Sequence, residues 1–206
     1  MKKVTIPTMV KDNKKIKDRR HKIIEASKKL FKEKGYYRTT TREIARSASM
    51  SYGAIYEYIG TKEDILYLFF EELYDRLNEI LHQKLSHNRT GKERLEIFIQ
   101  EYFSLMDHIS DEVNVMYKET GTLSKPHLEY VFSKETEFVE YVKETVLLSL
   151  KEAGNTVADE MADICVHNLI VQGHMWAFRG WHLKKKYSLA TYTKLQTEIC
   201  MKCLDL

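Results

Sequence analysis

Residues 40–64 read TTREIARSASMSYGAIYEYIGTKED, and this stretch decides the fold. Thr40 and Glu43 have the spacing of a capping box, in which each residue satisfies a free backbone amide of the other, so a short helix is predicted to begin here. Ser51 is placed to cap a second short helix, and Thr61 to cap a long one. Two short helices separated by about four residues predict a helix-turn-helix.

The flanking sequence predicts further helices. Apolar residues recur at helical spacing from about residue 19 to residue 34 and stop at Gly35, and similar patterning continues to the end of the chain. Only 2 Pro and 8 Gly occur in 206 residues, which leaves few turn signals for a sheet. We expect an all-α protein of about nine helices, with an N-terminal three-helix helix-turn-helix domain at 18–64 and a helical domain at 65–206.

Charge is distributed unevenly along the chain. Residues 1–62 carry 17 Lys and Arg against 6 Asp and Glu, whereas the remainder carries 16 against 24. A basic end on an acidic body is typical of a protein in which one part approaches a phosphate backbone, although charged residues on solvated helix faces are the simpler alternative. Residues 1–17 are lysine-rich without helical periodicity and are expected to form a mobile basic arm.

Composition and motifs argue against several other classes of protein. The first 20 residues lack the apolar run of a secretion signal, and no stretch of about 18 residues is free of charge, so a cytoplasmic protein without a membrane contact is expected. No Ser-His-Asp order, glycine-rich phosphate loop or zinc motif appears, which disfavours an enzyme. We expect no cofactor and no metal.

The three cysteines are expected to be reduced thiols. Cys165, Cys200 and Cys203 are few and odd in number, which fits a reducing compartment better than a disulfide framework. Cys200 and Cys203 form a single C-x-x-C without a second pair or nearby histidines to complete a zinc site.

The stretch 40–64 and its flanks resemble the N-terminal signature of the TetR family of transcriptional repressors. The matching positions are Gly35, Tyr36, Thr39, Thr40, Ile44, Ala45, Ser51, Gly53, Ile55, Tyr56, Tyr58 and the run 61–66. One position departs from the pattern: the turn holds Ser49 where the family usually has glycine, and a non-glycine residue resists a positive φ. The resemblance implies a homodimer that binds double-stranded DNA and is released by a small-molecule effector.

The resemblance also implies which side chains meet DNA. Phosphate contacts are expected from Thr40, Thr41, Arg42, Tyr56, Tyr58 and Lys62. Base edges are expected to meet Ser51, Tyr52, Gly53 and Ala54, since glycine allows close backbone approach and alanine can touch a thymine methyl group. For one of the three tyrosines, packing between helices is an equal alternative, and Ile44, Ala45, Ile55 and Ile59 are assigned to the small core of this domain.

The C-terminal half is expected to bind the effector and to form the dimer. The segments 157–180 and 188–204 resemble in position the helix pair with which family members dimerise. Aromatic and methionine side chains are enriched in the middle of the chain, and such residues line both adaptable pockets and ordinary cores. The residues expected to contact a ligand are Phe98, Tyr102, Phe103, Met106, Met116, Tyr117, Phe138, Tyr141, His174, Phe178 and Arg179.

The effector class is less constrained by the residues. The segment 176–181 faintly resembles regulators that respond to acyl-CoA or related lipid metabolites, and Arg179 is suited to pair with an acidic group of such a ligand. A drug-responsive efflux regulator of the same fold and a ligand-independent dimeric DNA-binding protein remain alternatives, and activation in place of repression depends on where the operator lies.

Overall fold

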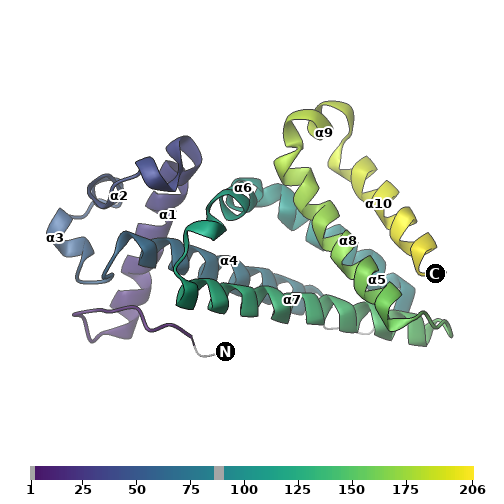
Figure 1. The fold of residues 1–206 in the computed structure, drawn as a ribbon. Helices are drawn as coiled ribbons and strands as arrows, with labels where there is room; N and C mark the ends of the chain where they lie inside the picture. The colour runs from purple at the N-terminus through teal and green to yellow at the C-terminus, as the bar shows by residue number, and fades with distance from the viewer. Residues whose placement is uncertain (1–2, 86–90) are drawn as a thin grey trace. The chain divides into compact units, whose positions relative to one another are not determined.

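The computed structural model describes residues 3–85 and 91–206, and the side chains within them except at 80–85. Ten α-helices and a short 3-10 helix account for most of this described part, which contains no strand, so the all-α prediction is confirmed (Figure 1). None of the described helices is long and apolar enough to span a bilayer. The helices are α1 (Asn13–Arg38), α2 (Thr41–Ser47), α3 (Tyr52–Ile55), α4 (Lys62–Leu85), α5 (Gly91–His108), α6 (Ser110–Glu119), η1 (Thr120–Thr122), α7 (Lys125–Glu152), α8 (Asp159–Phe178), α9 (Gly180–Lys186) and α10 (Leu189–Cys203).

The chain packs as two compact units whose limits differ from the predicted domains. Unit 1 comprises the described residues of Met1–Tyr74 together with Asn114–Lys134, and unit 2 comprises those of Asp75–Val113 and Glu135–Leu206. Unit 1 therefore contains the helix-turn-helix, the first turns of α4 and a segment far along the chain. The sequence could not predict that residues 114–134 belong to unit 1, because they join it only through tertiary contacts.

Apolar side chains from several helices fill unit 1. Ile44 and Ala45 of α2, Ile55 of α3 and the following Ile59 are buried, as the sequence predicted. They pack with buried residues of α1, α4 and α7, namely Ile23, Ile24, Phe31, Ile65, Leu66, Phe69, Phe70, Tyr130 and Val131. Helices as short as α2 and α3 are stable only when one face is buried in this way.

Residues 3–12 pack within unit 1, and α1 begins at Asn13, which corrects the prediction of a mobile arm over residues 1–17. Helix α1 starts early because the Asp12 carboxylate accepts a hydrogen bond from the amide of Lys15 (3.0 Å). Upstream of it, Ile6 is buried, and its carbonyl accepts a hydrogen bond from the Arg20 guanidinium (3.0 Å). Ile6 and Arg20 thus anchor the N-terminal segment, although its lysine content predicted that solvent surrounds it.

Unit 2 has an aromatic core centred on α5. Tyr102 is fully buried, its hydroxyl donates to the carbonyl of Ile170 (3.0 Å), and its ring lies 5.8 Å from those of Phe98 and Phe138. A Cβ added to Gly173 of α8 would lie 2.4 Å from the Tyr102 ring. Glycine at this position therefore allows α8 to approach α5 closely.

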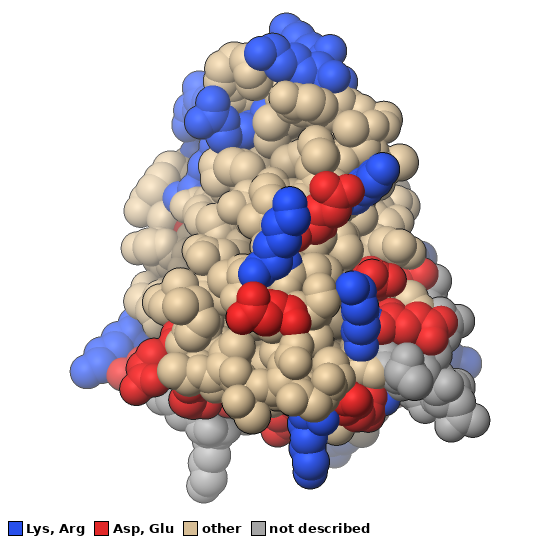
Figure 2. All heavy atoms as spheres, turned by 90° about the vertical axis from the view of Figure 1, so that its right-hand side faces the viewer, with Lys and Arg blue, Asp and Glu red and all other residues tan. Residues whose placement is uncertain are grey.

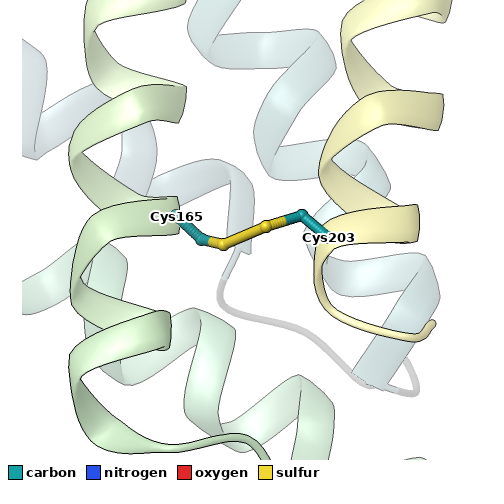
Figure 3. Close-up of a disulfide and its surroundings, with 2 residues drawn as sticks. All are labelled: Cys165 and Cys203. Atoms are coloured by element: carbon teal, nitrogen blue, oxygen red, sulfur yellow. A yellow bond between two sulfur atoms is a disulfide. The ribbon is translucent and has the colours of Figure 1, made fainter.

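A disulfide joins Cys165 of α8 to Cys203 of α10 (Figure 3). This corrects the expectation that all three cysteines are reduced thiols; Cys200 is free and buried. The two bonded residues are 38 positions apart, so only the packing of α8 against α10 brings their sulfurs together.

The turn between α2 and α3 places Ser49 in the left-handed region, with φ 56°. The amide of Met50 donates to the carbonyl of Ala45 (2.8 Å) and closes the turn. The structure thus keeps the conformation that glycine would favour, although serine occupies the position.

We expect Ser49→Gly to raise the free energy of unfolding by about 0.5 to 1 kcal/mol, because glycine adopts a left-handed φ without the strain of an L side chain. Urea denaturation followed by circular dichroism measures the change. The matched control is Ser47→Gly at the exposed end of α2, where glycine should instead cost roughly 0.5 kcal/mol. Equal effects at the two positions would contradict the strain assigned to Ser49.

Candidate nucleic-acid interface

The start of α2 is a complete capping box, as predicted. The Glu43 amide donates to the Thr40 hydroxyl (3.3 Å), and the Thr40 amide donates to the Glu43 carboxylate (2.9 Å). The Lys34 ammonium donates to the same carboxylate at 2.5 Å, and this bond, followed by those from Thr40, lowers the pKa of Glu43 to about 2. The first turn of α2 is therefore held in place, with the neighbouring Arg42 exposed.

The first turn of α3 faces solvent. The Ser51 hydroxyl accepts a hydrogen bond from the amide of Ala54 (3.1 Å), which confirms the predicted cap. Ser51, Tyr52 and Gly53 are exposed, and Ala54 is half-buried. A Cβ added to Gly53 would meet nothing within 4 Å, so the backbone here is open to a closely approaching partner.

Three side chains from α2 and the α3 region form one cluster. The rings of Tyr52 and Tyr56 lie 5.3 Å apart, edge to face, with their hydroxyl oxygens at 3.3 Å. The Arg42 guanidinium carbon lies 5.1 Å from the centre of the Tyr52 ring, within the range of a cation–π interaction. The hydrogen bond between the two hydroxyls raises the pKa of Tyr52, so the cluster offers a guanidinium and the protonated phenol of Tyr52, which suit phosphate oxygens.

Two of the residues expected to contact DNA take part in the packing of unit 1. Tyr58 is only 3% exposed, so it corresponds to the packing alternative considered for the tyrosines. The Lys62 ammonium donates to the carbonyls of Tyr36 (3.0 Å) and Thr39 (3.1 Å), and lies 4.1 Å from the centre of the Tyr36 ring. Burial lowers the pKa of Lys62.

Lys62 meets two carbonyls where a helix ends, and one of them, the carbonyl of Tyr36, also accepts a hydrogen bond from the amide of Thr39 (3.1 Å). Helical geometry in α1 breaks at Gly35, whose φ is 79° and ψ 165°, as its predicted role as a helix stop requires. The amide of Tyr36 donates to the carboxylate of buried Glu119 (3.0 Å). Burial, aided by nearby carboxylates such as Glu63, raises the pKa of Tyr36 to about 12.

The start of α4 is fixed by two neighbouring carboxylates. Asp64 accepts hydrogen bonds from the amides of Gly60 and Thr61, both at 2.8 Å. Glu63 accepts one from the amide of Ser124 (2.7 Å) and contacts Nδ1 of His127 at 2.5 Å. Asp64 therefore holds the residues that precede α4, and Glu63 links the start of α4 to the start of α7 within unit 1.

Two exposed residues near this surface were not singled out from the sequence. Arg46 lies one turn after Arg42 on α2, so helical spacing could have placed both on one face. Tyr37 is 76% exposed next to buried Tyr36, and no sequence signal indicates this, because it depends on the chain reversal at Gly35.

The residues expected to contact a ligand are divided between the two units. Met116 and Tyr117 belong to unit 1, and the others to unit 2. Phe98, Tyr102, Phe103, Met106 and Phe138 are buried against one another or their neighbours, and Tyr141 is half-buried. His174 is also buried, which lowers its pKa to about 4 and keeps it neutral, whereas Tyr117, Phe178 and Arg179 are exposed.

One group in the described residues has the spacing of metal ligands. A nitrogen of His21 and carboxylate oxygens of Glu25 and Glu72 lie within 4.8 Å of one another. The Lys28 ammonium lies 2.6 Å from Glu25 and 3.4 Å from Glu72. These carboxylates are thus already paired with a cation, and an ion-pair network between α1 and α4 accounts for the group.

Known proteins are similar to this chain both in the helix-turn-helix segment and over most of its length. Residues 23–67 match the family described as bacterial regulatory proteins, tetR family. The chain is 29% identical over 190 residues to the HTH-type transcriptional regulator HbdR of Aromatoleum sp. (strain CIB), covering 92% of this chain and 82% of that protein.

Solved structures share the whole helical arrangement. A bacterial regulatory protein in the tetR family from Rhodococcus RHA1 has a TM-score of 0.79 at 20% identity, covering 90% of this chain and 96% of that one. AibR in complex with isovaleryl coenzyme A and operator DNA has a TM-score of 0.74 at 17% identity, covering 88% and 97%.

We expect Lys62→Met to lower the free energy of unfolding by about 2 kcal/mol, since it removes charge-assisted hydrogen bonds to two carbonyls of a helix end. Urea denaturation provides the measurement. Lys29→Met, an exposed lysine of α1, is the control and should change stability by less than about 0.5 kcal/mol. If Lys62→Met leaves the free energy of unfolding unchanged but weakens DNA binding, the ammonium contacts DNA and does not stabilise the fold.

Proposed function

Because the chain belongs to the TetR family of bacterial regulatory proteins, we propose that it is a transcriptional repressor that binds a palindromic operator as a homodimer and is released by a small, largely apolar effector. The observation that carries this proposal is the surface formed by exposed Arg42, Ser51 and Tyr52 and half-buried Tyr56, which lie on or directly next to two short helices. A helix-turn-helix of this size places its second helix in the major groove.

Within this surface the proposed contacts separate by chemistry. The exposed first turn of α3, with Ser51, Gly53 and Ala54, meets base edges, and Gly53 lets the backbone come close. Arg42 and Tyr56 meet phosphates on either side, as do Thr40 and Thr41 at the start of α2. The basic excess of residues 1–62 adds attraction that does not depend on sequence and weakens with salt.

The dimer is proposed to form through an exposed apolar stripe on α8 and α10. Met161, Ile164 and Val171 are exposed on α8 at intervals of three and seven residues, and Leu195 and Ile199 are exposed on α10. Such spacing places the side chains on one face of each helix. We name these five residues the α8–α10 face.

Hydrogen bonds hold the two helices of this face together. The Tyr192 hydroxyl donates to the carbonyl of Gln172 (2.8 Å), and the Gln196 amide donates to the Gln172 side chain (3.2 Å). Figure 2 looks from the side where α10 and α8 lie in Figure 1 and shows a broad area with few charged side chains. An exposed group of apolar side chains such as the α8–α10 face marks an interaction site on a globular protein, and a two-fold pair lets two reading helices reach successive half-sites.

An acyl-CoA or a related lipid metabolite is the proposed effector class. The support is the shared fold with AibR, whose structure was solved with isovaleryl coenzyme A and operator DNA. The interior of unit 2 includes several aromatic side chains and Met106, and the flexible Met106 can repack around an acyl chain. Release from DNA requires that the effector bind better to a state in which the two reading helices are spaced differently. Helix α4 has residues in both units, so it can transmit a change at the effector site to the DNA-binding helices.

This function also sets the expected compartment. A regulator that binds operator DNA acts in the bacterial cytoplasm, so we propose a cytoplasmic location.

Tyr56→Phe should weaken binding about fivefold, because one phenol hydrogen bond to DNA is worth about 1 kcal/mol. The probe is a duplex selected by the purified protein from a random pool, titrated by fluorescence anisotropy at fixed salt. Tyr58→Phe makes the same chemical change two residues away in the core and should leave the affinity unchanged. Unchanged binding by Tyr56→Phe would remove Tyr56 from the DNA surface.

Ile164→Glu should convert the dimer to a monomer, since it places a charge in a face that must be desolvated on association; Ile164 is 57% exposed in the single chain. Sedimentation velocity reports the assembly state. Leu148→Glu is the control, because Leu148 of α7 is 45% exposed in the same unit but lies outside the α8–α10 face. A stable dimer of Ile164→Glu would show that another surface pairs the chains.

A further inference from the structure

The three cysteines of the chain line one pocket between α8 and α10. Cys165 lies on α8, and Cys200 and Cys203 lie one turn apart on α10. Figure 3 shows Cys165 and Cys203 extending toward each other from the two helices and joined through their sulfurs. All the thiol chemistry of the protein is therefore gathered at one place.

The three sulfurs differ in how a small reagent can reach them. Cys203 is exposed in the last turn of α10, whereas Cys165 is buried. Cys200 is also buried, and burial raises its pKa to about 11, so it stays a protonated and weakly nucleophilic thiol at neutral pH. One sulfur is thus open to a reagent, one is placed to bond with it, and the third is kept out of the reaction.

The compartment decides whether this bond is permanent. If the chain acts on DNA, as proposed above, it works where cellular thiols keep cysteines reduced. A disulfide in such a compartment is formed when an oxidant appears and is removed afterwards, and Cys203, an exposed residue, gives a reducing thiolate a point of attack.

We propose that Cys203 and Cys165 form a reversible oxidation site for hydroperoxides. The Cys203 thiolate attacks a peroxide oxygen, the O–O bond breaks, and the departing oxygen takes up a proton and leaves as water or an alcohol, which makes Cys203 a sulfenic acid. The Cys165 sulfur then attacks the Cys203 sulfur, the S–O bond breaks and a water leaves. The two thiols lose two electrons and two protons in total, the peroxide is reduced by the same two electrons, and an external dithiol reverses the change by exchange.

The bond ties together the two helices that carry the α8–α10 face. It closes a loop between positions 38 residues apart, and cross-linking such a loop restricts the unfolded chain. We expect oxidation to raise the thermal midpoint by about 10 °C relative to the reduced protein.

Mass spectrometry of the full-length protein tests the site directly. The protein is reduced with dithiothreitol, desalted and treated with one equivalent of hydrogen peroxide, and free thiols are alkylated before digestion. We expect one cross-linked peptide that joins Cys165 to Cys203, with Cys200 alkylated. Dithiothreitol should then restore both thiols without denaturant, and the thermal midpoint should fall back.

Single substitutions separate the three roles. Cys200→Ser should keep the bond and the thermal shift. Cys165→Ser should leave Cys203 as a sulfenic acid that dimedone traps, because the partner sulfur is missing. Cys203→Ser should leave Cys165 unreacted after the same treatment, since Cys165 is buried.

Three results would overturn the proposal. These are a bond that includes Cys200, a bond between two chains in place of the internal one, or a Cys165–Cys203 bond that dithiothreitol reduces only after unfolding, which would make it a static cross-link. None of these measurements uses DNA or requires the dimer, so their failure would leave the proposed regulator function untouched, and loss of duplex binding would leave the oxidation site untouched.

Discussion

The Lys62 ammonium at the end of α1 is the interaction on which unit 1 depends. Helical geometry stops at Gly35, and beyond it the carbonyls of Tyr36 and Thr39 both accept from a donor outside α1, while the Tyr36 carbonyl also accepts from the Thr39 amide. Lys62 supplies that donor from the first turn of α4. Because α2 leaves α1 directly after these residues, the same contact sets where α2 and α3 begin relative to α4.

The surface proposed to meet DNA is supported by a partly exposed ion pair and by buried apolar residues. Glu43 and Lys34 hold the first turn of α2, and buried Ile44 and Ile55 anchor the two short helices. Arg42, Tyr52 and Tyr56 then stay on the outside as one cluster. A reading surface needs such a rigid support, since a helix of four residues has no stability of its own.

In unit 2 the inner and outer faces of α8 serve different purposes. Gly173 lets the inner face meet Tyr102, so the aromatic core closes around α5. The outer face keeps Ile164 and its neighbours exposed, and Cys165 lies beside it, bonded to α10. A change of packing inside unit 2, whether from an effector or from the disulfide, therefore acts on the same helix that carries the proposed dimer face.

The sequence by itself determined the elements that depend on near neighbours: the capping box at Thr40, the cap at Ser51, the stop at Gly35 and the burial of Ile44 and Ile55. Such features follow from interactions within a few residues, which spacing reveals. The tertiary structure alone decided that Lys62 and Tyr58 pack inward, that segment 114–134 joins unit 1, that Ile6 anchors the N-terminal segment, and that Cys165 meets Cys203. Each of these depends on a contact between residues that are distant in the chain, and neither composition nor helical periodicity predicts which distant residues meet.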